Sequence, residues 1–328
     1  MRVFQSWPLL AVSVGLLLAS ALGGCAAPQG RAPSVTTAAR VVGDAAPASP
    51  WWRHCGDPAL ARLVDGGLRT DPRLQREATA LDEAESRARQ WRLRLVDAWR
   101  AALAGGEPVN LDASARHLAR ARQRKAEAIA LTYVELQQLQ AVRGLRDAMQ
   151  AQFRDDAKIA AWRRQAGLVS AVDAGLGTTL IGVNADALQA SDARLAALRA
   201  TLARQTGVSE SDLAQLPDEM LPIAAPEVAA GGTAATADRS ALAAAAARES
   251  TLLGVTRAAE RNASDARAAY QLGSGDFATV YATEAALLDV REAALAARAA
   301  HARAAIRLWT DLGLAAAVPL TSVNGAHR

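Results

Sequence analysis

Residues 162–173 read WRRQAGLVSAVD, and residues 268–279 read AAYQLGSGDFAT. Each stretch has a helical run, a glycine and the start of a second helical run. Gly167 in the first copy pairs with Gly273 in the second, at an offset of 106 residues (273 − 167). A glycine that follows a helix allows the left-handed backbone that ends it. The sequence therefore predicts a duplicated helical hairpin that turns at these two glycines.

The second arm of each hairpin is predicted to be long. Ser170 with Asp173, or Asp276 in the second copy, is placed to cap this arm. The arm is expected to end at Gly207 in the first copy and at Gly313 in the second, again 106 residues apart (313 − 207). At 1.5 Å per residue, the arm from Gly167 to Gly207 would be roughly 60 Å long. Helices of this length must pack side by side.

The composition agrees with an all-α fold. The chain has 328 residues, of which 51% are hydrophobic but only 4% aromatic. Alanine supplies much of the apolar fraction, and alanine favours helix while burying little area per residue. Runs of β-branched and aromatic residues, which are typical of sheets, are nearly absent. We therefore expect a coiled-coil-like bundle of long antiparallel helices.

The first 24 residues are typical of an export signal. Arg2 gives a basic start, residues 7–18 form an apolar core, and Leu22 is followed by two glycines and Cys25. This pattern resembles the lipobox of bacterial lipoproteins, which implies cleavage before Cys25 and acylation of that cysteine, palmitate included. Anchoring by more than one acyl chain is stable. An ordinary cleaved signal peptide with a chance cysteine is the alternative.

The mature chain after the signal has no apolar run of about 18 residues, the length that a transmembrane helix needs. Cys55 is the one other cysteine, and we expect it to be a buried small side chain. The net charge is +4, and the densest basic segment is 116–125, RHLARARQRK. It lacks the interleaved aromatics of a nucleic-acid site. We expect a solvated helix face there, or one near anionic lipid head groups.

Helix starts are marked along the chain by aspartate and proline pairs. Asp57-Pro58 and Asp71-Pro72 predict a short helix near 58–69 and a long one from about 72 to 103. We divide the chain into a signal peptide (1–24), a lipid-anchored tether (25–50), a first helical repeat (51–216), a linker (217–237), a shortened second repeat (238–314) and a tail (315–328).

A series of short motifs extends over most of residues 51–314. They are Trp51-Trp52, Gly56-Asp57-Pro58, Leu63-Val64, Tyr133-Val134-Glu135-Leu136, Ala166-Gly167-Leu168, Leu202 before Gly207, Tyr270, Gly273, Asp276-Phe277, Val280 and Arg307-Leu308-Trp309. In their order and spacing these motifs resemble the outer-membrane efflux proteins, the TolC-like family, and in particular its lipid-anchored branch. The resemblance implies a protomer of a helical barrel, a homotrimer and an outer-membrane location.

The chain departs from this family where membrane strands are expected. Members carry two β-hairpins per protomer, and a membrane strand needs roughly 9–11 residues. Between Trp91 and Ala115 the alternation of apolar and polar residues is short, and a helix face of Trp91, Leu95 and Trp99 fits better. After residue 238, residues 241–269 are expected to form one unbroken helix. The sequence therefore predicts little or no β-barrel.

The resemblance assigns the functional site to the two helical turns. In the family they face the periplasm, where a membrane-fusion adaptor docks and links the channel to an inner-membrane pump. The matching residues are Ala166, Gly167 and Leu168 in the first copy and Leu272, Gly273 and Ser274 in the second. The glycines could instead serve only to end helices. The family's aspartate six residues after the glycine is Asp173 in the first copy, but Thr279 stands there in the second.

No catalytic, metal or cofactor site is predicted. His54, His117, His301 and His327 lack the partners of a metal or acid–base site, and we expect them to be isolated surface residues. Two functions remain open. The chain is either an efflux component that passes small molecules across the outer membrane, or a non-conducting helical scaffold derived from that family. Neither involves nucleic acid or enzymatic chemistry.

Overall fold

The computed structural model describes residues 41–42, 50–93, 111–217, 220, 222–228 and 236–316. These residues all belong to one compact unit, Ala38–Arg328. The predicted signal peptide, the predicted lipidation site Cys25 and most of the predicted tether lie outside the described residues, as does the chain after Ala316.

Almost every described residue is helical. The helices are α1 (Pro58–Thr70), α2 (Pro72–Leu93), α4 (Leu111–Gln165), α5 (Ala171–Thr206), α6 (Glu210–Leu213), α7 (Thr236–Gln271) and α8 (Phe277–Ala316), preceded by a 3-10 turn η1 (Trp51–Arg53). Two short strands, β1 (Val41–Val42) and β2 (Glu227–Val228), pair in parallel. The prediction of an all-α chain of long antiparallel hairpins is confirmed.

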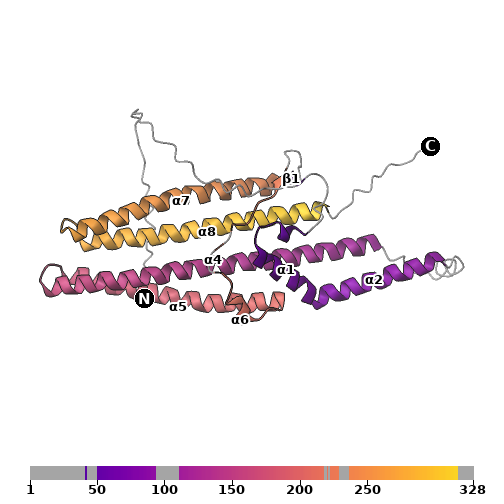
Figure 1. The fold of residues 1–328 in the computed structure, drawn as a ribbon, viewed down its shortest axis with the longest axis horizontal. Coiled ribbons are helices and arrows are strands. Elements are labelled where there is room, and N and C mark those ends of the chain that lie inside the picture. The colour runs from indigo at the N-terminus through magenta and orange to yellow at the C-terminus, as the bar shows by residue number, and fades with distance from the viewer. Residues whose placement is uncertain are drawn as a thin grey trace, which may run out of the picture. The chain divides into compact units, whose positions relative to one another are not determined.

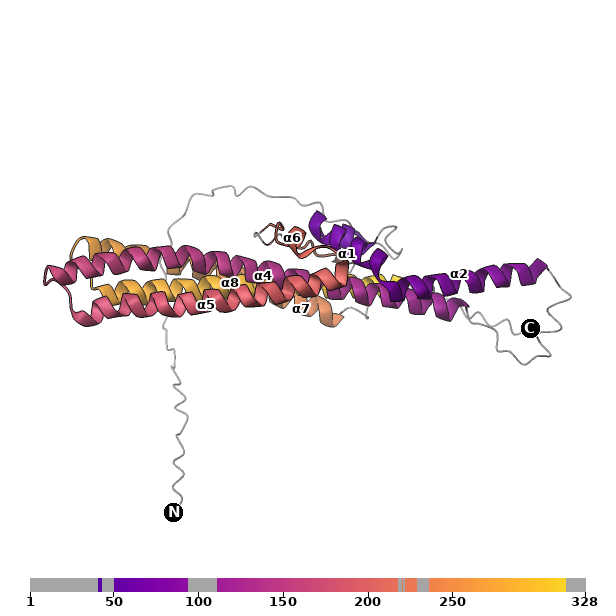
Figure 2. The same cartoon turned by 90° about the horizontal axis from the view of Figure 1, so that it is seen from below.

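The four long helices lie side by side. α7 packs on α8, α8 on α4, and α4 on α5, so the two hairpins meet through α8 and α4 (Figure 1). Both hairpin turns lie at the same end of this array (Figure 1). α2 continues along the other end of α4, as the view from below also shows (Figure 2). Each long helix buries one side against its neighbour, so the array is held by extended interfaces of small side chains.

The aspartates predicted to cap helices do so. Asp57 accepts hydrogen bonds from the backbone N–H groups of Ala59 (2.8 Å) and Leu60 (3.1 Å) at the start of α1. Its other carboxylate oxygen accepts a bond of 2.9 Å from the Tyr133 hydroxyl. Asp71 caps α2 in the same way, through the N–H of Arg73 at 2.9 Å. These bonds satisfy N–H groups that have no partner inside the helix.

The duplication is exact in the positions of the helix ends around the turns. α4 ends at Gln165 and α7 at Gln271, while α5 begins at Ala171 and α8 at Phe277, each pair 106 residues apart (271 − 165 and 277 − 171). Both hairpins therefore turn through the same number of residues.

The second hairpin differs from the first at its far end. Gly207 has a φ of 73° and follows the end of α5, as predicted. Gly313 was predicted to end α8 but lies inside it, and the helix continues to Ala316, so this prediction was wrong. A Cβ on Gly313 would lie 3.1 Å from Gln123 Nε2 and 3.5 Å from Trp51 Cδ1. This glycine allows close packing of α8 on α4 and on η1.

The main core lies where the ends of the hairpins meet α1 and η1. Trp51, Leu60, Ile129, Leu202 and Ile306 are among its buried side chains. The linker between the repeats also packs here, since Met220 and Ile223 belong to this core. The carbonyl oxygen of Ala224 accepts a hydrogen bond from Trp309 Nε1 (2.8 Å), and its N–H donates to the Cys55 carbonyl (3.0 Å). The described part of the linker therefore acts as a strap across the helices.

The second repeat is shorter than the first. α4 has 55 residues but α7 has 36, and α7 begins at the position that matches residue 130 of α4 (236 − 106). The predicted unbroken helix over 241–269 is confirmed. The predicted extension of α2 to about residue 103, with Leu95 and Trp99 on its face, lies outside the described residues beyond Leu93. In the described part of the chain, we find no helix with the length and apolarity needed to span a bilayer.

Candidate functional site at the two hairpin turns

The two turns have the same backbone. In the first tip (166–170), Gly167 has a φ of 72°, its N–H donates to the Arg164 carbonyl (2.9 Å), and the Leu168 N–H donates to the Arg163 carbonyl (2.8 Å). In the second tip (272–276), Gly273 and Ser274 repeat both bonds, and Gly273 has a φ of 79°. This pair of bonds is the Schellman motif, which satisfies the last carbonyl groups of a helix.

The tips expose large apolar side chains. Leu168 is 72% exposed and Leu272 is 84% exposed. In the sequence, Leu168 follows its glycine, whereas Leu272 precedes its glycine. Beside the first tip, Trp162 is 65% exposed and Val172 is 71% exposed. Apolar side chains of this size gathered on a turn, with backbone groups already satisfied, fit a surface that contacts another protein.

One arginine ties the two tips together. Both terminal nitrogens of Arg163 donate to the backbone carbonyl of Tyr270, at 3.4 and 3.3 Å. The guanidinium also lies 3.9 Å from the centre of the Tyr270 ring, in cation–π contact. Arg163 lies in the last turn of α4 and Tyr270 in the last turn of α7, so this contact links the helix ends that lead into the two tips.

An aromatic cluster supports the second tip from within. Phe277 lies 5.0 Å from Tyr270 and 4.2 Å from Tyr281, measured between ring centres, and all three side chains are buried. Burial, with the nearby charges of Asp156 and Glu284, raises the pKa of the Tyr281 hydroxyl. The first tip has no such cluster among its described residues, because Val172 and the side chains around it point outward.

Two carboxyl groups meet behind the tips. Glu284 is fully buried, and its Oε1 accepts bonds from Gln152 Nε2 (2.9 Å) and Arg267 Nε (2.6 Å). Burial, together with the neighbouring charge of Asp156, raises the pKa of Glu284 to about 7. Burial also raises the pKa of Asp156. This group joins α4, α7 and α8 and is partly protonated near neutral pH.

The acidic positions after the two glycines differ. Asp173 is the third residue of α5, and its side chain lies outside the described side chains. Asp276 caps α8, since its Oδ1 accepts from the Thr279 N–H (2.6 Å) and its Oδ2 from the Thr279 hydroxyl (3.0 Å). These bonds, first of all the one from the backbone, hold the pKa of Asp276 below its usual range. Both the N–H and the hydroxyl of Thr279 are therefore used in the cap of α8.

Sequence reasoning identified the glycines but missed Trp162, Arg163 and the Asp156–Glu284 pair. Trp162 lies in the quoted stretch, and an aromatic residue one turn before a helix-ending glycine was a usable signal. The pairing of Asp156 with Glu284 had no signal in the sequence, because the residues are far apart and neither lies in a motif.

Other candidates do not form sites. Among the described residues, no group of three or more histidine, cysteine, aspartate or glutamate side chains is arranged to hold a metal. Cys55 is buried as predicted, and burial, followed by the charge of Asp57, raises the pKa of its thiol to about 12. His301 was predicted to be an isolated surface residue, but it is half-buried with Nδ1 2.6 Å from Glu249 Oε2. That prediction was wrong, since the pairing partner lies on α7.

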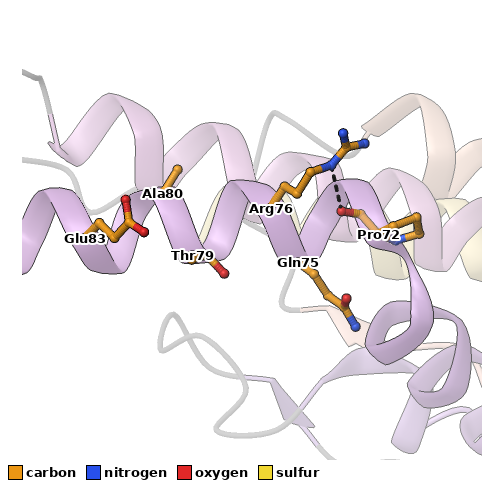
Figure 3. A pocket seen from close by; sticks show the side chains of 6 residues that line it. All are labelled: Pro72, Gln75, Arg76, Thr79, Ala80 and Glu83. Carbon is orange, nitrogen blue, oxygen red and sulfur yellow. Dashed lines mark hydrogen bonds between the residues drawn. The ribbon is translucent and has the colours of Figure 1, made fainter.

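Hollows on the surface also lie away from the tips. One is lined by residues that all come from one face of α2 (Figure 3). They are Pro72, Gln75, Arg76, Thr79, Ala80 and Glu83. Arg76 Nε donates to the Pro72 carbonyl (3.1 Å), so its charged group follows its own helix. A depression on one helix has no opposing wall to enclose a small molecule.

Comparison with known proteins identifies the fold. No family model matches the sequence, and no curated protein sequence matches it. Among solved structures, the outer-membrane channel OprN is similar over 87% of this chain and 98% of that chain, with a TM-score of 0.65 and 13% identity. VceC, an outer membrane protein of the bacterial pathogen Vibrio cholerae, is similar over 81% of this chain and 99% of that chain, with a TM-score of 0.64 and 14% identity.

A third similar structure is CusC, described for its folding and transmembrane channel formation. It is similar over 87% of this chain and 99% of that chain, with a TM-score of 0.58 and 12% identity. OprN is a channel of the outer membrane, and VceC is a protein of the outer membrane. The chain therefore has the fold of the TolC-like outer-membrane efflux proteins, as the resemblance of its sequence motifs implied.

Proposed function

We propose that this chain is an outer-membrane efflux component of the TolC-like family, anchored through Cys25, that passes small molecules across the outer membrane as part of a tripartite system. It docks a periplasmic membrane-fusion adaptor through its two tips and so joins an inner-membrane pump. The pump supplies the energy, and this chain contributes the conduit without catalysing a reaction.

The paired tips are the observation that carries this proposal. Two turns built by the same hydrogen bonds lie at one end of the helices and present Leu168 and Leu272 to the solvent. A turn that only ends a helix does not need a large apolar side chain with most of its surface exposed. The Arg163 contact holds the tips in a fixed relation, so a partner meets a prepared surface.

The edges of the array support assembly as a homotrimer. α5 and α7 are the outermost long helices, and they expose Val183 (on α5) and Leu253 and Val255 (on α7). Apolar side chains on both edges fit packing of α5 of one copy against α7 of the next. An interface between unlike edges closes into a ring when the rotation allows.

A photo-cross-linking amino acid placed at single positions tests the proposal in cells. At Leu168 or Leu272 we expect cross-links to a membrane-fusion adaptor, identified by mass spectrometry. At the matched exposed position Val183 we expect cross-links to a second copy of this chain and none to the adaptor. Leu168→Asp with Leu272→Asp should weaken adaptor binding on the order of tenfold or more. Adaptor capture from Val183, or from no position, would contradict the assignment of the tips.

The shortened second repeat favours a second function. The described residues of the second half contain no helix that matches residues 111–129, since α7 begins at the position that matches residue 130. A chain that has lost this part could hold adaptor or channel proteins together as a periplasmic scaffold without conducting.

Conductance separates the two functions. The purified, lipidated chain is added to a planar bilayer, and deletion cells are tested for drug sensitivity with and without the chain. Single-channel steps and restored resistance support transport. Absence of both, with adaptor cross-linking at the tips retained, supports the scaffold.

A further inference from the structure

The net positive charge of the chain is concentrated in the first part of α4. Residues 111–125 carry four arginines, one lysine and one aspartate, a net charge of +4, which equals that of the whole chain. Arg116, Arg120 and Arg124 follow one another at intervals of four residues, so they lie along one side of the helix. We name these three residues the arginine stripe.

None of the described residues pairs with the arginines of the stripe. Arg120 and Arg124 are exposed and Arg116 is half-buried, and none of the three has a salt bridge or side-chain hydrogen bond to a described residue. Lys125, by contrast, pairs with Asp71 at 3.0 Å. Three guanidinium groups in a row repel one another unless an anionic partner is present.

Acidic groups mark the inner boundary of the stripe. Glu127 lies one turn after Arg124, near Asp311 of α8 and Asp238 of α7. A hydrogen bond with Asp238, followed by burial and the charges of Asp238 and Glu127, raises the pKa of Asp311 to about 6. Positive charge therefore faces outward from residues 116–124, while negative charge collects where α4 meets the second hairpin.

The stripe lies beside the point where the chain enters the fold. Trp51 follows the predicted tether directly, and its Nε1 donates to Gln123 Oε1 at 2.7 Å. Gln123 stands between Arg120 and Arg124. Cys25 is 26 residues before Trp51 (51 − 25), which bounds their separation at about 90 Å for a fully extended chain. The first tip lies roughly 65 Å from Gln123, because residues 123 to 167 of α4 and its turn separate them.

We propose that the arginine stripe binds the anionic phosphate head groups of the bilayer in which Cys25 is anchored. This rests on the lipid anchor of the proposed function. The anchor raises the effective concentration of the surface near Trp51 and so strengthens the binding that the three arginines provide. Binding at this end also directs the tips away from the membrane, because they lie at the opposite end of α4 (Figure 1).

A vesicle co-sedimentation experiment tests the stripe without the anchor. It uses residues 38–328, which contain every described contact and form one compact unit. Vesicles of phosphatidylglycerol in phosphatidylcholine should bind this chain, and vesicles of phosphatidylcholine alone should not. Changing Arg116, Arg120 and Arg124 to Gln should weaken binding on the order of a hundredfold.

A matched control uses three exposed arginines of α7. Arg248, Arg257 and Arg261 changed to Gln remove the same charge from a helix of the same array, and binding should stay within about twofold of the parent chain. Circular dichroism at equal concentration confirms that both variants keep their helix content. An equal loss of vesicle binding in the two variants would mean that only the net charge matters, and it would overturn the proposal.

Two further arms exclude other anions. Inorganic phosphate, compared with chloride at equal ionic strength, should cause no extra loss of vesicle binding, and a specific loss would indicate a site for free phosphate instead. A single-stranded oligonucleotide should displace vesicles only weakly. If the oligonucleotide displaced vesicles at a lower concentration than the anionic lipid needs for binding, nucleic acid would be the partner and the proposal would be overturned.

The anchor is tested separately. Palmitate labelling of the full chain in cells, compared with Cys25→Ala, reports acylation alone. Labelling with no vesicle binding by residues 38–328 would overturn the stripe and leave the anchor intact. Vesicle binding without palmitate labelling would show that Cys25 is not acylated, while the arginine stripe would still bind anionic lipid.

Discussion

The two hairpins have the same backbone at their turns but different surroundings. The helix ends match residue for residue, and Gly167 and Gly273 have nearly equal φ angles of 72° and 79°. Trp162 and Val172 beside the first tip are exposed, whereas Tyr270, Phe277 and Tyr281 beside the second are buried. Both tips expose a leucine, Leu168 in the first and Leu272 in the second, but only the second is backed by a buried aromatic cluster among the described residues.

This difference shows that two copies of a repeat can keep the same backbone turn while their side-chain packing diverges. The hydrogen bonds of a turn depend on backbone groups and one glycine, so they survive many changes of side chain. Packing and exposure depend on which side chains surround the turn, so they diverge. Four sets of substitutions test this contrast between the tips.

Phe277→Ala should have the largest effect. It removes the centre of the aromatic cluster under the second tip and should cost about 3–4 kcal/mol of unfolding free energy, since the cavity cannot collapse among long helices. Trp162→Ala at the exposed side of the first tip should cost less than about 0.5 kcal/mol. Urea unfolding followed by circular dichroism measures both. Similar losses for the two would show that the first tip is also packed.

Glu284→Gln should change how stability depends on pH. The pKa of Glu284 is raised from 4.5 to about 7, so the folded chain binds more protons than the unfolded chain between these values. The contribution of Glu284 to stability is therefore greatest below pH 4.5, falls as the pH rises toward 7 and is level above it, a loss on the order of 2 kcal/mol.

The variant should lose most of this slope and keep a smaller one of the same sign from Asp311, whose pKa is raised to about 6. Urea midpoints over the pH range measure the slope. Glu83→Gln on the exposed face of α2 is the control and should leave it unchanged. The equivalent position in the first hairpin is Thr178, whose side chain does not ionise.

Gly167→Ala and Gly273→Ala should cost about the same, roughly 1–2 kcal/mol each, because both glycines have positive φ and open space around them. Gly182→Ala within α5 meets nothing within 4 Å and should instead add about 0.5–1 kcal/mol, since alanine is the better helix former. Thermal unfolding compares the three. Costs at Gly167 and Gly273 that differ by more than about 1 kcal/mol would break the backbone equivalence of the tips.

Arg163→Gln should have the smallest measurable effect, about 0.5–1 kcal/mol, from loss of the cation–π contact with Tyr270. Arg164→Gln is the neighbouring control, since Arg164 is exposed and forms no ion pair with a described residue. Double-mutant cycles with Tyr270→Leu isolate the contact. A coupling near zero would mean that the tips are held together by α4 and α8 alone.

Much of the fold follows from local sequence. Asp57-Pro58 and Asp71-Pro72 start helices, Gly167 and Gly273 end them, and the repeat of 106 residues predicts two matching hairpins. Gly313 shows the limit of this reasoning. The same glycine that ends a helix at a free end is tolerated inside α8, because Gln123 and Trp51 pack against it there.

The sequence predicts the positions of the two turns in the candidate site but not the side-chain contacts around them. The turns were found at Gly167 and Gly273, but the exposure of Trp162 and the bond of Arg163 to Tyr270 were not. Arg163 and Tyr270 are 107 residues apart in sequence, and Gln152 and Glu284 are 132 apart. No pattern of spacing within one helix indicates such a pair.

The starts, turns and repeat of the helices follow from local sequence, since capping bonds and glycine conformations act over a few neighbouring residues. Folding was needed to show that α8 and α4 join the hairpins, that Asp156 and Glu284 share a buried site, and that a buried aromatic cluster supports the second tip. The reason is that burial is a property of the neighbours a side chain meets after folding, and those neighbours come from distant parts of the chain.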